Sequence, residues 1–295
     1  MTRQETNRGG TAERRTNTDA HANAIPGTIT VGLAQLAVES GDRTGNLERA
    51  LEAIERASER GADLVALPEL FTVGYFAFDR YAASAEPLEG DTMSRLREAA
   101  IEHDVALLAG SFVEDLAATE ADETPANEGY ANTSVLFSAD GTRELVYRKH
   151  HLFGYDSAET ELLVPGERID TATVCGITVG VSTCYDLRFP ELYRQLIDQG
   201  ADLLLVPSAW PYPRLEHWQT LSRARAIENQ CYVATINGSG TFEDATLLGR
   251  STVYDPWGTV LASSGDDPTL VMAEIDPDSV AAVRERFPAL RDRRF

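Results

Sequence analysis

The chain has 295 residues, of which 43% are hydrophobic, and this is enough to bury the core of one large domain. Its 47 acidic residues outnumber the 26 lysine and arginine residues, and the net charge of -21 disfavours binding to nucleic acids or anionic membranes. Because the acids are spread along the chain, we hypothesise a halophile-like acidic surface whose self-repulsion is screened by salt. Stability that did not depend on salt would contradict this hypothesis.

The ends of the chain differ in composition from its middle. Residues 1–27 are polar and lack periodicity, which predicts a disordered tail, followed by one domain over 28–287 and a short tail over 288–295. No apolar run approaches the length that spans a membrane. Three cysteines without a paired spacing argue against a disulfide framework and are typical of a reducing compartment. We therefore expect a cytoplasmic protein.

The first half of the domain is expected to alternate strands and helices. Apolar patterns predict strands and amphipathic patterns predict helices. The expected strands cover 28–36, 105–114, 131–138 and 143–149, and the expected helices cover 44–60 and 92–103. Residues 61–69 are expected to form a turn followed by a short apolar strand. A turn at 139–141 joins the last two strands.

The second half repeats this order. The expected strands cover 177–186, 200–210, 231–237, 251–254, 258–263 and 269–275, and the expected helices cover 190–199, 215–229 and 277–286. Both halves contain the same series: a helix, the sequence Gly-Ala-Asp-Leu, an apolar strand and a proline. The Gly-Ala-Asp-Leu sequence begins at residue 61 in the first half and at residue 200 in the second. This repeat predicts an α/β fold of two similar halves, in which two sheets pack into a four-layer α-β-β-α sandwich.

Three residues with complementary chemistry lie at or near the carboxyl ends of expected strands, where α/β proteins gather their sites. They are Glu69, Lys149 and Cys184. Lys149 is the only lysine of the chain, and lysine offers a compact ammonium whose pKa responds to burial. A carboxylate can take the thiol proton, while an ammonium stabilises the thiolate and a later oxyanion. The sequence thus predicts a nucleophilic cysteine site.

A second oxyanion donor is expected from the backbone N–H of Tyr185, the residue after the cysteine. The alternative for Glu69 is a solvated acid at the end of a strand, and the alternative for Cys184 is a small core residue. Cys175 and Cys231 fit that second description better, because both lie in or beside apolar strands.

Several segments are similar to motifs of the nitrilase superfamily, the carbon–nitrogen hydrolases. They are LPELFTVGY (67–75), YRKHHLF (147–153), CYDLRFPELYRQL (184–196), HWQTLSRARAIENQCYV (217–233) and VYDPWGTVLA (253–262). The resemblance covers about residues 29–275, and its three catalytic motifs occur in the order of the family. It implies an α-β-β-α sandwich, association as homodimers or higher homo-oligomers through helical faces, and no metal or organic cofactor.

The resemblance also implies roles. Glu69 would be the general base, Lys149 the oxyanion stabiliser and Cys184 the nucleophile of an amidase that forms a thioester and releases ammonia. Members often have a further glutamate shortly before a Pro-Gly pair. Glu159 fits that place, and its neighbour Glu161 is the alternative.

The segment CYDLRFPEL is most similar to the ω-amidase and deaminated-glutathione amidase branch, whose substrates are amides with a distal carboxylate. Arg188 would pair bidentately with that carboxylate, and its alternative is a structural ion pair with Asp186 or Glu191. Aromatic residues that follow Glu69 and the second Gly-Ala-Asp-Leu strand are expected to line the substrate pocket: Phe71, Tyr75, Trp210 and Tyr212.

Other functions stay open. Within the superfamily they are N-carbamoyl amine hydrolysis, nitrile hydrolysis and acyl transfer to an amine. A catalytically silent binding or regulatory protein would keep the same fold. A metal site built from His150, His151 and His217 with Cys184 is disfavoured, because adjacent histidines on a strand point to opposite faces.

Overall fold

The computed structural model describes residues 27–120, 123–155, 157–242 and 245–294. Almost all of the expected N-terminal tail, residues 1–27, therefore lies outside the described residues, as does the last residue of the expected C-terminal tail. No helix in the described ranges combines the length and the apolar character that crossing a membrane requires.

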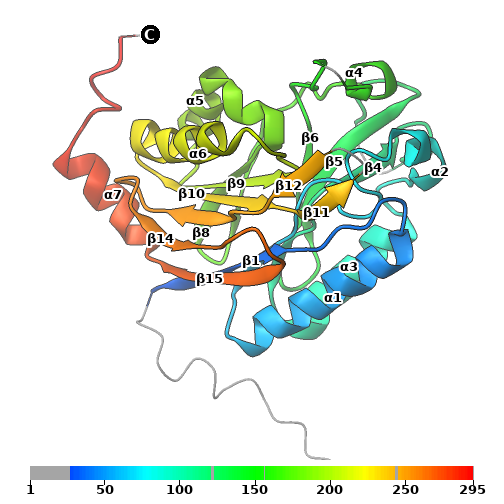
Figure 1. Ribbon diagram of the computed structural model, residues 1–295. Helices are drawn as coiled ribbons and strands as arrows, with labels where there is room; N and C mark the ends of the chain where they lie inside the picture. The colour runs from blue at the N-terminus through cyan, green and yellow to red at the C-terminus, as the bar shows by residue number, and fades with distance from the viewer. Residues whose placement is uncertain (1–26, 121–122, 156, 243–244, 295) are drawn as a thin grey trace, which may run out of the picture.

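The first sheet has the strand order β15-β1-β2-β3-β5-β4, and β6 also pairs with β5. Its strands are β1 (Ile29–Gln35), β2 (Leu64–Ala66), β3 (Ala106–Leu108), β4 (Phe112–Asp115), β5 (Tyr130–Phe137), β6 (Arg143–Arg148) and β15 (Thr269–Ile275). The helices α1 (Arg43–Glu59) and α3 (Asp91–His103) cover its outer face (Figure 1). The short elements η2 (Phe78–Arg80), α2 (Tyr81–Ser84) and α4 (Glu159–Leu162) lie in connections.

The second sheet has the strand order β14-β13-β10-β9-β8-β7. Its strands are β7 (Thr171–Val174), β8 (Ile177–Val181), β9 (Leu203–Ser208), β10 (Tyr232–Asn237), β13 (Thr252–Tyr254) and β14 (Val260–Ser263). The helices α5 (Pro190–Asp198) and α6 (Leu215–Asn229) cover its outer face (Figure 1). The strands β11 (Ser239–Phe242) and β12 (Ala245–Leu248) form a separate two-stranded sheet. The helix α7 (Pro277–Arg286) follows β15.

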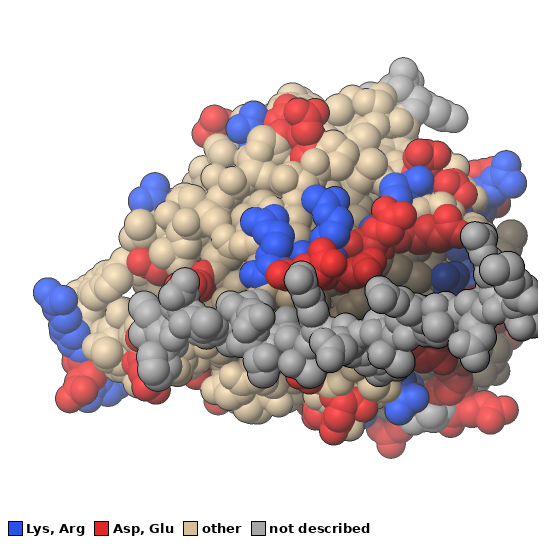
Figure 2. Space-filling view, turned by 90° about the horizontal axis from the view of Figure 1, so that it is seen from below, with Lys and Arg blue, Asp and Glu red and all other residues tan. Residues whose placement is uncertain are grey.

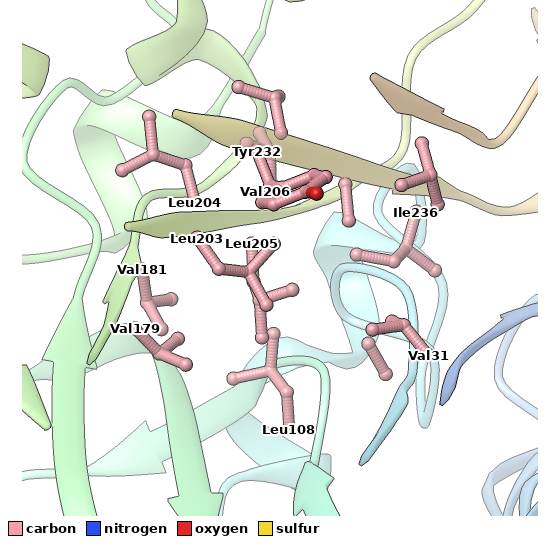
Figure 3. Packing of buried hydrophobic residues seen from close by; sticks show 14 of the residues in the cluster. Val31, Leu108, Val179, Val181, Leu203, Leu204, Leu205, Val206, Tyr232 and Ile236 are labelled. Atoms are coloured by element: carbon pink, nitrogen blue, oxygen red, sulfur yellow. The ribbon is translucent and has the colours of Figure 1, made fainter. Parts of the chain in front are cut away.

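The two sheets pack face to face, which makes the predicted four-layer sandwich. In Figure 3, Leu203 and Leu205 of β9 lie on the side of Leu108 and Val31 from the first sheet, while Leu204 lies on the other side. All of these side chains are fully buried. A continuous apolar run such as that of β9 is typical of a strand that is buried on both faces.

The two halves are less separate than the repeat predicts. Strand β15 comes from the second half of the chain, yet it pairs antiparallel with β1 along its whole length, from Ile29 opposite Ile275 to Gln35 opposite Thr269. The expected strand over 105–114 is in fact two strands, because the chain turns at Gly110 with a φ of 57°. A Cβ there would lie 2.3 Å from the carbonyl oxygen of Pro68. Strands β7, β11 and β12 were not predicted.

Acidic and basic side chains are interspersed on the surface that Figure 2 shows. A band of acidic side chains runs beside basic ones near the centre of this face, and further acidic side chains lie around its edge. Basic side chains form no continuous patch in this view, which agrees with the charge balance of the sequence.

Candidate active site

The three residues at the predicted strand ends come together at one end of the sandwich. Lys149 directly follows β6, and Glu69 lies in the turn after β2. The strand expected over 177–186 ends earlier than predicted, at Val181. Cys184 instead opens the 3-10 turn η3 (Cys184–Arg188) with a φ of 45°, which is the left-handed region that side chains rarely adopt. This sharp turn points the cysteine away from the path of β8.

Lys149 lies between two carboxylates. Its Nζ is 2.9 Å from Oε1 of Glu69 and 2.8 Å from Oε1 of Glu159. All three side chains are buried. Burial alone would lower the pKa of Lys149, but the charges of Glu159 and Glu69 outweigh it and hold the pKa well above its usual range. Lys149 is therefore a fixed cation.

Glu69 accepts hydrogen bonds from several parts of the chain. The backbone N–H of Ala209 donates to its Oε2 at 2.8 Å, and Asn132 Nδ2 donates to its Oε1 at 2.9 Å. Its carboxylate also interacts with the thiol of Cys184. Burial raises the pKa of Glu69, and the cation of Lys149 offsets part of that rise. A carboxylate of raised basicity thus contacts the thiol.

Cys184 is buried beside the carboxylate of Glu69. Burial raises the pKa of the Cys184 thiol well above its usual range, and the negative charge of Glu69 adds to that rise. The resting group is therefore a thiol, and its proton has Glu69 as an acceptor. Outside its own 3-10 turn, the backbone N–H of Tyr185 has no acceptor among the described residues, so it is free to donate into the pocket.

Glu159 occupies the place that the sequence left open between two glutamates. It is fully buried at the start of α4, whereas Glu161 is exposed. The backbone N–H of Phe153 donates to Glu159 Oε2 at 2.7 Å, and the hydroxyl of Tyr75 donates to it at 3.1 Å. Burial holds the pKa of Tyr75 well above its usual range, so this hydroxyl stays a donor.

A cavity of about 560 Å³ leads to Cys184. Tyr75, Trp210 and Tyr212 line it, as the sequence predicts, together with further aromatic residues. Phe71 does not line it, and this prediction was wrong. Its ring is fully buried in the core between the first sheet and its covering helices, because the turn after Glu69 directs it inward.

Arg188 is half-buried in the wall of this cavity. Its guanidinium lies 4.8 Å from the ring centre of Trp210 and donates to Nδ1 of His217 at 3.3 Å. The alternative ion pairs with Asp186 and Glu191 are not among the ion pairs of the described residues. Asp186 instead accepts from the hydroxyl of Tyr147 at 2.6 Å. Burial lowers the pKa of Arg188, since no carboxylate offsets it.

Asn132, Phe153 and Arg214 are among the residues of the site that were not predicted, as is Ala209. Asn132 donates to Glu69 at 2.9 Å and to Glu159 at 3.3 Å, and the polar run that it begins within the buried strand β5 was a usable signal. Phe153 lies in a motif that was recognised for its lysine alone. Arg214 also lines the cavity, and nothing in the local pattern distinguishes it from the other arginines.

The adjacent histidines considered for a metal site stack on different aromatic rings. The ring of His150 stacks on Tyr147 at 5.4 Å, and the ring of His151 stacks on Phe189 at 3.7 Å. Across the described ranges, no group of three or more histidine, cysteine, aspartate or glutamate side chains is arranged to hold a metal ion.

Comparisons with known proteins agree with this geometry. The carbon-nitrogen hydrolase family model matches residues 30–285. The 2-oxoglutaramate amidase of Paenarthrobacter nicotinovorans is 40% identical over 238 residues, which are 79% of each chain. The omega-amidase NIT2 of Xenopus tropicalis is 36% identical over 263 residues, which are 85% of this chain and 90% of that protein.

Solved structures share the fold. Saccharomyces cerevisiae Nit3, a member of branch 10 of the nitrilase superfamily, superposes with a TM-score of 0.80 at 33% identity, covering 91% of this chain and 97% of that one. A mutant of the amidase from Nesterenkonia sp. AN1 carries the acetamide moiety of fluoroacetamide on its active-site cysteine. It superposes with a TM-score of 0.77 at 31% identity, covering 92% of this chain and 95% of that one. The chain therefore belongs to the carbon–nitrogen hydrolase family, within the nitrilase superfamily.

Proposed function

We propose that this enzyme hydrolyses the terminal amide of small molecules that carry a carboxylate at the opposite end, through a thioester on Cys184. One observation carries the proposal. The buried cluster of Glu69, Lys149 and Cys184 opens into a cavity whose wall holds Arg188 without a described carboxylate partner. The names of the relatives, 2-oxoglutaramate amidase and omega-amidase, support the same class of substrate.

The first half of the reaction makes the thioester. The sulfur of Cys184 attacks the amide carbon while its proton passes to Glu69, whose raised pKa suits a general base. The carbonyl electron pair moves to oxygen. Lysine has three N–H donors. Glu69 accepts from one, and the two oxygens of Glu159 can share a second, so the third is available for this oxyanion beside the N–H of Tyr185.

The collapse of the tetrahedral intermediate breaks the carbon–nitrogen bond. Glu69 gives its proton to the departing nitrogen, and ammonia leaves. Water then attacks the thioester and loses a proton to Glu69, and the same donors hold the second oxyanion. Breaking the carbon–sulfur bond releases the acid, and the proton returns to Cys184. Glu159 fixes Lys149 through both of its oxygens, at 2.8 and 3.0 Å, and is the second carboxylate available to orient that water.

An ammonia-release screen tests the proposal. It compares ω-amides of dicarboxylic acids, N-carbamoyl amines and simple nitriles, with Cys184→Ala as the blank. We expect the carboxylate-bearing amides to give the highest kcat/KM. A preference for N-carbamoyl amines or nitriles would favour the other reactions of the superfamily. No turnover of any of them, together with no preferential labelling of Cys184 by iodoacetamide, would favour a silent binding protein.

Two further features belong to this proposal. We infer a homodimer or higher homo-oligomer, since large apolar side chains lie exposed near the outer face of the second sheet. They include Ile227, Trp257 and Phe287. We also infer a cytoplasmic location, because the chain has three cysteines, and in the structure none of them is paired in a disulfide.

A further inference from the structure

The wall of the cavity holds two arginines on neighbouring aromatic rings. The guanidinium of Arg188 lies 5.8 Å from the ring centre of Tyr185, in addition to its contact with Trp210. The guanidinium of Arg214 lies 5.6 Å from the ring centre of Phe153. The rings of Phe153 and Tyr185 pack edge to face at 4.9 Å, so the two arginines rest on the two members of one aromatic pair.

Hydrogen bonds hold the backbone of Arg214 in place beside the cavity. The indole N–H of Trp210 donates to the carbonyl oxygen of Arg214 at 3.1 Å, and the N–H of Arg214 donates to the carbonyl oxygen of Pro211 at 3.3 Å. Trp210 thus contacts both arginines, one through its ring face and the other through its N–H. Both side chains are half-buried and both line the cavity that leads to Cys184.

Among the residues that the structure describes, the charges around the cavity are unbalanced. No carboxylate among the described residues forms an ion pair with either arginine. Asp79 is the acidic residue among the described residues that line the cavity, and it pairs with Arg80 at 3.2 Å. Burial lowers the pKa of Arg188, and the positive charge of Arg214 lowers it further. Two like charges that face one cavity are unfavourable when it is empty, and an anion between them would relieve this cost.

The aromatic contacts use none of the N–H donors, and Arg188 gives one of its donors to His217. A guanidinium that rests on a ring by its face keeps its N–H groups in the plane, directed away from the ring. A carboxylate has about four lone-pair positions, so it can accept bidentate hydrogen bonds from two arginines at once.

We propose that Arg214 and Arg188 together form a carboxylate clamp, and that Arg214 is a specificity-determining residue for amides with a terminal carboxylate. This inference rests on the proposed function, since it adds a second cation to the recognition of the same substrate class. The clamp holds the end of the substrate opposite the amide, and the aromatic wall of the cavity encloses the chain between them.

The test compares two amides that differ at one end. Glutaramate carries a carboxylate opposite the amide, and pentanamide has a methyl group there. We expect Arg214→Gln to lower kcat/KM for glutaramate about tenfold to a hundredfold, as for a lost hydrogen bond to a charged group, mainly through KM. For pentanamide the change should stay within about threefold. Arg214→Lys, which keeps the charge without the planar fork, should fall in between.

Two other variants sharpen the result. Arg56→Gln removes an exposed arginine in the last turn of α1 that does not line the cavity, and it should leave the ratio of the two kcat/KM values unchanged. Arg188→Gln should reduce the same ratio. Because both arginines hold one carboxylate, the double variant should lose less than the product of the two single losses. Losses that simply multiply would contradict a shared clamp.

Different outcomes would overturn the carboxylate clamp and the proposed substrate class. Equal losses on both amides in Arg214→Gln would mean that Arg214 only supports Phe153 and, through it, Glu159, and would overturn the inference. An unchanged ratio in both variants of Arg214 would overturn it as well. If the unaltered enzyme hydrolyses pentanamide as well as glutaramate, the proposed substrate class itself fails. Melting temperatures of Arg214→Gln and Arg214→Lys show whether both variants are folded.

Discussion

At Lys149 the fold places one ammonium between two carboxylates and removes all three groups from water. Buried charges are costly unless they are paired, so this arrangement persists only because every member has partners. The pairing also fixes the direction of the remaining N–H of Lys149. The chain, which uses arginine at every other basic position, keeps its one lysine where a compact donor is needed.

Replacing Lys149 by arginine should therefore fail despite the retained charge. The planar guanidinium cannot occupy the space of an ammonium between Glu69 and Glu159, and we expect kcat to fall by about a hundredfold or more, as when an oxyanion donor is lost. Steady-state ammonia release measures it. The converse exchange on the same strand, Arg143→Lys, alters a surface ion pair with Glu89 and is the control that should retain activity. A Lys149→Arg enzyme within about tenfold of normal would contradict the role of this residue.

The pKa shifts at Glu69 and Cys184 determine the pH dependence. Glu69 must be ionised to accept the thiol proton, and its pKa is raised by burial, so kcat/KM should fall with decreasing pH above the range of an ordinary glutamate. The pKa of Cys184 lies well above 9, so thiolate formation should cause no loss up to that pH. Asn132→Leu removes a hydrogen-bond donor to Glu69 and so raises the pKa of this glutamate further. The acid limb, the fall of kcat/KM at low pH, should therefore move to higher pH. An acid limb at or below the ordinary glutamate pKa of 4.5 would contradict this account.

Among the elements, the turn η3 is the one that the site depends on most. The φ of 45° at Cys184 costs free energy and needs support from the surroundings. Asp186 supplies that support from within the turn. Its carboxylate accepts from the N–H of Thr183 at 2.9 Å, the hydroxyl of Tyr147 at 2.6 Å and the N–H of His151 at 2.9 Å. It therefore ties the Cys184 turn to the segment that follows Lys149.

Asp186→Asn should weaken this tie. The amide nitrogen would face groups that are themselves donors, so at least one hydrogen bond is lost at a fully buried position. We expect the free energy of unfolding to fall by about 1–3 kcal/mol and kcat to fall more than KM changes. Denaturant unfolding and steady-state kinetics check the two parts. A stable variant with normal kcat would show that the turn does not need this carboxylate.

The elements also show what sequence patterns can and cannot predict. Helices α6 and α7 were predicted with the observed bounds. For α7 the sequence carries clear signals, since Asp276 caps its start, a proline follows and arginines lie in its last turn. The end of β8 was predicted too late, since no glycine marks the left-handed residue at Cys184. The contacts of Asn132 and Arg214 could not be predicted, because they depend on how strands far apart in sequence meet. Glu159 was preferred to Glu161 from the family motif, and the structure buries Glu159 against Lys149.

At the scale of the whole molecule, the last strand closes the first sheet. Because β15 pairs with β1, the two halves cannot separate without breaking a full-length antiparallel pair. Self-association of the protein then depends on its acidic surface and on its exposed apolar side chains. The rings of Trp257 and Phe287 lie 6.1 Å apart and are about half exposed. Large apolar side chains gathered on a surface indicate an interface.

We expect the protein to be a homodimer or larger in solution, with this patch in an interface. Trp257→Asp should shift the mass measured by light scattering toward the monomer, because it places a charge in an apolar contact. Ile101→Asp, which alters an exposed apolar residue on α3 of the other helical layer, should leave the mass unchanged. A monomeric unaltered protein at micromolar concentration would contradict the expectation.

The central claim is that Cys184 carries an acyl group between two halves of the reaction. Hydroxylamine, which competes with water for a thioester, tests it directly. Glutaramate and the monomethyl ester of glutaric acid form the same acyl group, so we predict the same ratio of hydroxamate to acid from both, and no product of either kind from Cys184→Ala. A ratio that depends on the leaving group, or turnover by Cys184→Ala, would contradict the thioester.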